Sequence, residues 1–101
     1  MSNPANVGDA AVTLGAAGGN VVVTLENFDD AAFTDVVFTM NFGGSAATAV
    51  ALPTTARANA GTQATFRVAG TSRPSVSATV KYTNSRTGKA GTVTASGAVT
   101  I

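Results

Sequence analysis

Apolar and polar residues alternate in short runs along most of the chain, and clusters of Gly, Pro, Asn and Asp separate these runs. Alternation with a period of two is typical of β-strands that bury one face, and such clusters mark turns. The clearest run covers residues 34–42, TDVVFTMNF. It predicts a strand whose inward face carries Val36, Phe38, Met40 and Phe42.

Six further runs have the same character and recur about every ten residues. No stretch shows the i, i+3, i+4, i+7 spacing of a helix, so we predict about seven strands and no helix. The expected inward residues of these six runs are Val12 and Leu14; Val21, Val23 and Leu25; Val50 and Leu52; Ala64, Phe66 and Val68; Val76, Ala78, Val80 and Tyr82; and Val93, Ala95, Gly97, Val99 and Ile101.

Composition agrees with an all-β protein of one domain. The 101 residues include 16 Thr and 13 Val, which favour strands, but only one Glu and two Lys. A chain of this length forms one core with a radius of gyration of about 13 Å. We expect residues 1–9 to be a flexible N-terminal arm and residues 10–101 to form the domain.

Two stretches resemble immunoglobulin-like modules that lack a disulfide. Residues 20–42, NVVVTLENFDDAAFTDVVFTMNF, are similar in pattern to the second and third strands of such modules, and residues 75–101 resemble their final hairpin. The resemblance implies a single immunoglobulin-like antiparallel β-sandwich of about seven strands. It leaves the strand order open, because jelly rolls and small Greek-key barrels share the same pattern.

The chain has no cysteine, histidine or tryptophan. Disulfides, thiolate catalysis and metal binding by Cys or His are therefore excluded. A general base near neutral pH is usually histidine, and the acidic residues here lie in bends. We expect a protein that is not an enzyme and that needs no cofactor.

One acidic bend contains the right ligand type for calcium. Glu26, Asp29, Asp30 and Asp35 fall within ten residues. Calcium prefers carboxylate oxygens, but the spacing matches no EF-hand loop. Asp is also common in polar turns, so the bend is only a weak candidate for a calcium site.

Charge is distributed unevenly although the net charge is only +1. All five acidic residues precede residue 36, and all six basic residues follow residue 56. This separation of charge suits contacts with another protein or between copies of the same chain. The alternative is that the distribution arose by chance and that the charged residues of each half only keep its loops soluble. The expected partner-binding residues are Arg57, Arg67, Arg73, Lys81, Arg86 and Lys89.

The low net charge and the scarcity of exposed aromatic residues argue against nucleic acid as a partner. The N-terminus lacks the features of a secretory signal, and no apolar run is long enough to span a membrane.

Charged residues make up 11% of the chain, against about 25% in typical proteins. We therefore expect strand surfaces of small uncharged residues, among them Val22, Thr24, Val37, Thr39, Thr79, Thr94 and Ala98.

Small, uncharged strand surfaces can pack closely against another protein. This character is similar to that of phage capsid decoration and other virion structural proteins. It suggests a protein located in the virion that binds the major coat protein, or copies of itself as a homo-oligomer. The alternative is an extracellular, adhesin-type binding module cut from a longer secreted protein. A composition biased by the genome would also explain the abundance of Ala, Gly, Thr and Val.

Overall fold

The computed structural model describes residues 10–43, 47–68 and 75–99. Within these ranges the chain forms seven strands and no helix, and hence no helix that could cross a membrane. The radius of gyration is 13.2 Å, as the chain length predicts. The predicted arm, residues 1–9, lies outside the described residues. The strands are β1 (Ala10–Ala17), β2 (Asn20–Asn27), β3 (Phe33–Asn41), β4 (Ala47–Ala51), β5 (Ala60–Val68), β6 (Ser75–Asn84) and β7 (Ala90–Ala98).

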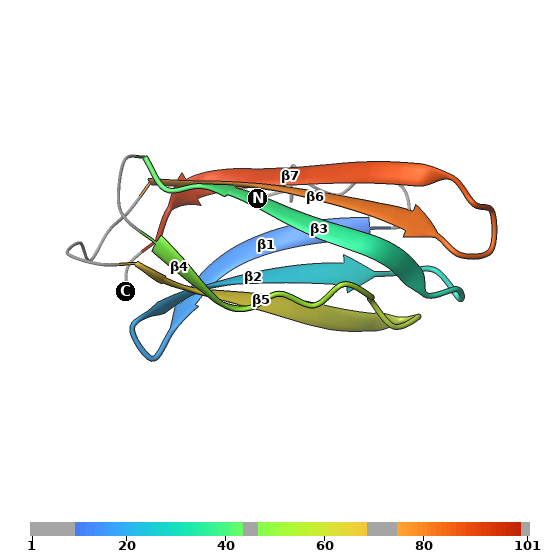
Figure 1. The fold of residues 1–101 in the computed structure, drawn as a ribbon, viewed down its shortest axis with the longest axis horizontal. Helices are drawn as coiled ribbons and strands as arrows, with labels where there is room; N and C mark the ends of the chain where they lie inside the picture. The colour runs from blue at the N-terminus through green and yellow to red at the C-terminus, as the bar shows by residue number, and fades with distance from the viewer. Residues whose placement is uncertain (1–9, 44–46, 69–74, 100–101) are drawn as a thin grey trace.

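The strands form two antiparallel sheets that pack as a sandwich (Figure 1). The four-stranded sheet has the order β1-β2-β5-β4, and the three-stranded sheet has the order β3-β6-β7. The predicted all-β sandwich of seven strands is therefore confirmed. The same strand order occurs in constant-type immunoglobulin domains, which resolves the topology that the pattern left open. Topology by itself carries no activity.

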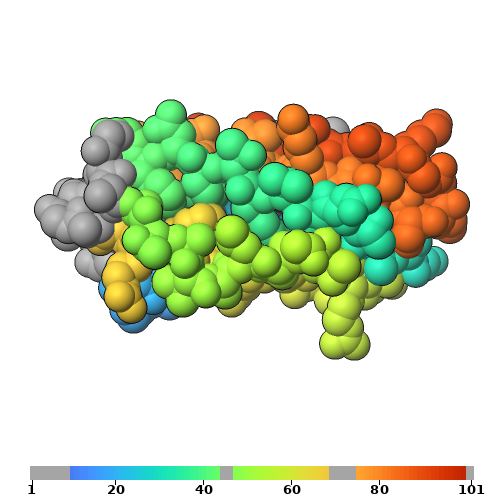
Figure 2. Space-filling model, in the orientation of Figure 1, coloured from blue at the N-terminus to red at the C-terminus, as the bar shows by residue number. Residues whose placement is uncertain are grey.

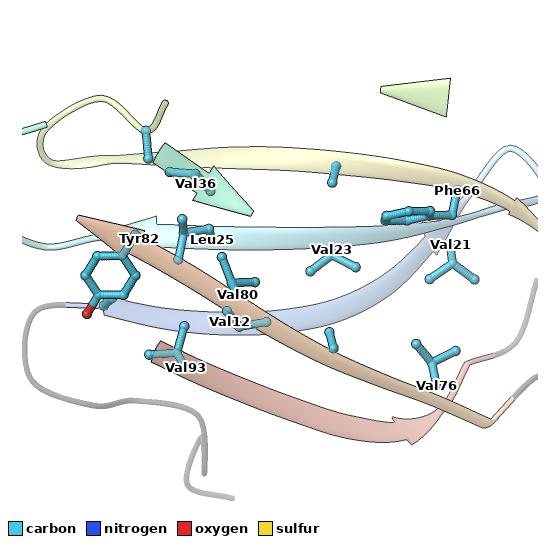
Figure 3. Packing of buried hydrophobic residues seen from close by; sticks show 14 of the residues in the cluster. Val12, Val21, Val23, Leu25, Val36, Phe66, Val76, Val80, Tyr82 and Val93 are labelled. Atoms are coloured by element: carbon cyan, nitrogen blue, oxygen red, sulfur yellow. The ribbon is translucent and has the colours of Figure 1, made fainter. Parts of the chain in front are cut away.

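The core lies between the sheets and consists mainly of valine and alanine, with two pairs of packed aromatic rings (Figure 3). The predicted inward face of β3 is confirmed, with Val36 and Phe42 buried and Phe38 and Met40 packed against the core. The inward faces predicted for β2, β5 and β6 are also confirmed, because every residue named for them is at most 7% exposed. Period-two alternation was a sufficient guide wherever a strand has neighbours on both sides.

Tyr82 lies over a glycine at one end of the core. Its ring stacks on Phe33 with 4.2 Å between ring centroids. On its other neighbouring strand, Tyr82 is paired with Gly91. A Cβ atom at Gly91 would clash with the Tyr82 ring. The missing side chain of Gly91 is what lets the ring lie flat across the sheet.

Several details of the predicted faces were wrong. Val50 and Leu52, expected inside, are 55% and 50% exposed. β4 is an edge strand with an irregular register between Ala49 and Ala51, so its alternation does not continue to Leu52. Near the end of β7, Gly97 is exposed, whereas Val93 and Val99 are buried as predicted. Ile101 lies outside the described residues.

β3 begins earlier than its pattern indicates. A bulge lies between Thr34 and Val37, where two residues face one position on β6. The extra residue lets Phe33 turn inward as well as Val36, and both are buried. Asp35 within the bulge has a φ of 50°, in the left-handed region.

Candidate functional site

The basic residues expected to bind a partner are spread over the molecule. Arg67 lies on β5 and Lys81 on β6, and both side chains are exposed on strands of different sheets. Arg57 lies between β4 and β5, next to the bridge that joins Ala56 to Phe33. The described residues of this set therefore do not form one common surface, since the outer faces of the two sheets point in opposite directions. Arg73 lies outside the described residues, and Arg86 and Lys89 follow β6 in its hairpin loop.

The hairpin loop brings basic residues to the acidic bend. Arg86 donates from one guanidinium nitrogen to both carboxylate oxygens of Asp29, at 2.7 Å each. Asn84 donates its side-chain amide to the same carboxylate at 2.8 Å. The side chain of Asp29 is only 8% exposed, against 60% for Arg86. The acidic and basic halves of the sequence thus meet within one chain at this end of the sandwich.

Two buried asparagines position this cluster. Asn27 and Asn84 are the last residues of β2 and β6, and they are 1% and 5% exposed. The side-chain oxygen Oδ1 of Asn27 accepts the backbone N–H of Asp29, and Oδ1 of Asn84 accepts the backbone N–H of Arg86. Such Asx turns hold the backbone two residues beyond the strand end. Each asparagine therefore ends a central strand and places the charged residue that follows it.

Sequence reasoning missed these asparagines. An Asn at the end of a strand, two residues before a charged residue, was visible in both NFD and NSR. The contact between Asp29 and Asn84 spans 55 positions, and no local pattern predicts it.

The acidic residues do not converge on a calcium site. Asp29 accepts from Arg86 and Asn84, while Asp30 accepts from the side-chain amide of Asn59 at 3.0 Å. Asp35 is exposed in the β3 bulge, and Glu26 lies on β2. In the part of the chain that the structure describes, no three acidic residues come close enough to hold a metal ion. A guanidinium occupies the place where a cation would have to approach Asp29.

A polar hollow of about 310 Å³ lies beside the cluster. Asp29, Arg86, Thr87 and Lys89 contribute to its lining, and Tyr82 closes part of it. The Asp29 carboxylate in this hollow already accepts hydrogen bonds from Arg86 and Asn84, so these contacts link the two sheets at this end of the molecule.

The two phenylalanines that flank the acidic bend differ in burial. Phe28, which precedes Asp29, is 54% exposed, whereas Phe33 after the bend is fully buried.

The outer face of the three-stranded sheet presents regular rows of residues. Residues opposite one another on β3, β6 and β7 form three rows that alternate with buried positions. Six of the nine residues are Ser or Thr, and one is charged. We call this surface the Ser/Thr face, and its rows are Val37, Lys81 and Thr92; Thr39, Thr79 and Thr94; and Asn41, Ser77 and Ser96.

Comparison with known proteins adds no relative: no family model, no curated protein and no solved structure matches this chain.

Proposed function

We propose that the protein is a non-enzymatic structural module that decorates and stabilises a repetitive protein lattice, and that this lattice is a virus capsid. The observation that carries the proposal is the Ser/Thr face. Its three rows hold short side chains, with Lys81 as the one charge among nine residues. Short side chains lose little conformational entropy when covered, and they let a second backbone approach closely.

The proposed mechanism is additive. Each copy would bury a modest area against coat protein, and many copies on one shell would sum weak contacts into a large stabilisation. The strand order shared with immunoglobulin domains supports a relation to the immunoglobulin-like modules of phage decoration proteins. Such a role needs a rigid body with a complementary surface and no reacting groups.

The electrostatic part of this proposal rests on fewer residues than the sequence indicates. Arg86 is bound to Asp29 of its own chain, so a charge reversal there would also disturb the fold. Lys81 lies on the Ser/Thr face itself, and Lys89 is exposed at the base of the β6–β7 loop, directly before β7. Lys89, which lies outside the Ser/Thr face, is therefore the better test of attraction to an acidic coat surface.

The test is binding to particles assembled from the coat protein that, under this proposal, the same viral genome encodes. Thr79→Lys places a charge in the central row of the Ser/Thr face and should lower occupancy about tenfold or more, because the charge would be buried on binding. Thr24→Lys makes the same change at a similarly half-buried position of β2, in the other sheet, and should leave occupancy unchanged. Equal occupancy for both variants, or no binding of the unmodified protein, would refute the proposal.

A further inference from the structure

The sandwich is closed along one side and hollow along the other. β1 and β7 lie in contact along the first side. On the opposite side run the edge strands β3 and β4, and atoms of β5 are visible between them (Figure 2). A groove of about 520 Å³ lies here; its lining is Asn41 and the apolar residues Phe38, Met40, Phe42, Ala47, Ala49 and Phe66. Alanine on one wall and larger apolar side chains on the other leave room for side chains from outside.

The first half of the β3 edge already takes a strand from its own chain. Phe33 and Ala56 exchange two backbone hydrogen bonds of 2.8 and 3.0 Å. The N–H of Val36 donates to the carbonyl of Thr54 at 2.9 Å. Before Pro53 the chain runs as β4 along β5, in the other sheet. Among the described residues, no strand lies beside β3 from Val37 to Asn41 on the side away from β6.

The backbone groups along this second half have a defined direction. Successive residues of a strand point their N–H and C=O groups to opposite sides. Because the Val36 N–H points away from β6, the groups of Phe38 and Met40 do so as well. The same two residues line the groove with their side chains. One ligand could therefore form backbone hydrogen bonds with Phe38 and Met40 and bury its side chains in the groove beside them.

We propose that this groove binds an extended segment of a partner protein, which adds to β3 as a strand beside Phe38 and Met40. The bound segment would continue the line of residues 54–56 beyond the point at which this chain leaves the edge. Six of the seven lining residues are apolar and none is charged, so we expect alternate residues of the segment to be apolar. Main-chain hydrogen bonds would supply affinity and the groove would select side chains.

A second copy of this chain fits the groove less well. Of the large apolar residues that the structure shows exposed, Val37, Val50 and Leu52 lie on or next to the groove's own two strands. Phe28 lies in the bend after β2. If two copies met here, the groove of one would face the groove of the other and neither would be filled. The side chains of an extended segment would fill it. The inference is independent of the Ser/Thr face and of the capsid proposal.

The experiment measures amide hydrogen exchange by NMR with synthetic peptides as probes. Three peptides alternate threonine with valine, leucine or phenylalanine, and matched peptides carry N-methyl groups on the amides that would face β3. We expect at least one unmethylated peptide to slow exchange at Phe38 and Met40, and its methylated form to have no effect. No protection by any of the three, or equal protection by the methylated forms, would overturn the proposal.

Adjacent variants on β4 supply the second arm. Ala49→Arg puts a charge into the groove, whereas Thr48→Arg puts the same charge on the neighbouring exposed residue, outside the groove lining. The first should weaken peptide binding about tenfold or more and the second less than about twofold. Equal weakening by both would contradict the groove. Protection of Phe38 and Met40 that rises with protein concentration alone would show a second copy as the occupant, and would overturn the choice of a partner segment.

Discussion

Asn84 donates its side-chain amide to the carboxylate of Asp29 across 2.8 Å, and so joins the last residue of β6 to the bend that follows β2. The two residues belong to segments from different sheets. Asp29 also holds Arg86 and accepts the backbone N–H of Ala31 at 3.2 Å. One carboxylate therefore connects a bend, a strand end and a hairpin loop.

Asp29→Ala should destabilise the protein by about 1–3 kcal/mol, because the largely buried amide of Asn84 would lose its acceptor. The neighbouring variant Asp30→Ala removes the same group from an exposed residue and should have a much smaller effect. Urea denaturation of both variants measures the difference. Equal midpoints for the two would contradict the structural role given to Asp29.

Gly91→Ala should cost about 1–3 kcal/mol, because the added methyl group would collide with the ring of Tyr82. Gly15→Ala is the matched control, since a Cβ atom at Gly15 meets no atom within 4 Å. That control should be neutral or slightly stabilising. Thermal denaturation compares them, and a Gly91→Ala variant as stable as Gly15→Ala would mean that the ring does not lie over the glycine.

Asp35→Gly should stabilise the protein by about 0.5–1 kcal/mol, because Asp35 has a φ of 50° that glycine adopts without steric cost. Asp35→Val should destabilise it, since a β-branched residue tolerates this conformation poorly. Thr39→Gly on the same strand serves as the opposite control and should be destabilising. Loss of stability in Asp35→Gly comparable to that in Thr39→Gly would contradict the bulge at this position.

Calcium should leave the melting temperature unchanged. A ligand that binds only the folded state raises the melting temperature, and the donors around Asp29 leave no place for a cation there. Scanning calorimetry in millimolar calcium and in EDTA should give the same midpoint. A rise in calcium that is abolished by Asp30→Asn would show that the acidic bend binds the ion after all.

The inward residues were predicted most completely in the strands that have two neighbours. In β2, β5 and β6 buried residues alternate strictly with more exposed ones, because one face of each strand packs on the core and the other faces solvent. In the edge strand β4 this alternation is absent, and all five residues are exposed. The small residues Ala47 and Ala49 line the groove while Val50 is exposed, the reverse of the expected amphipathic pattern.

The candidate sites were less predictable than the fold. Residue types alone suggested both attraction between copies and a calcium site, whereas the structure pairs Asp29 with Arg86 inside one chain. That pairing depends on two loops from different sheets reaching the same end of the sandwich. The strand order determines whether these two loops meet, and period-two alternation does not predict the strand order. The Ser/Thr face, in contrast, follows directly from the polar positions of three strands once their register is known.

The most direct test of the central proposal is the thermal stability of the coat-protein particle itself, measured with and without a saturating amount of this protein. A cementing role predicts that the disassembly temperature of the particle rises with occupancy, and that Thr79→Lys prevents the rise while Thr24→Lys does not. A particle that binds the protein at full occupancy but comes apart at an unchanged temperature would contradict the account.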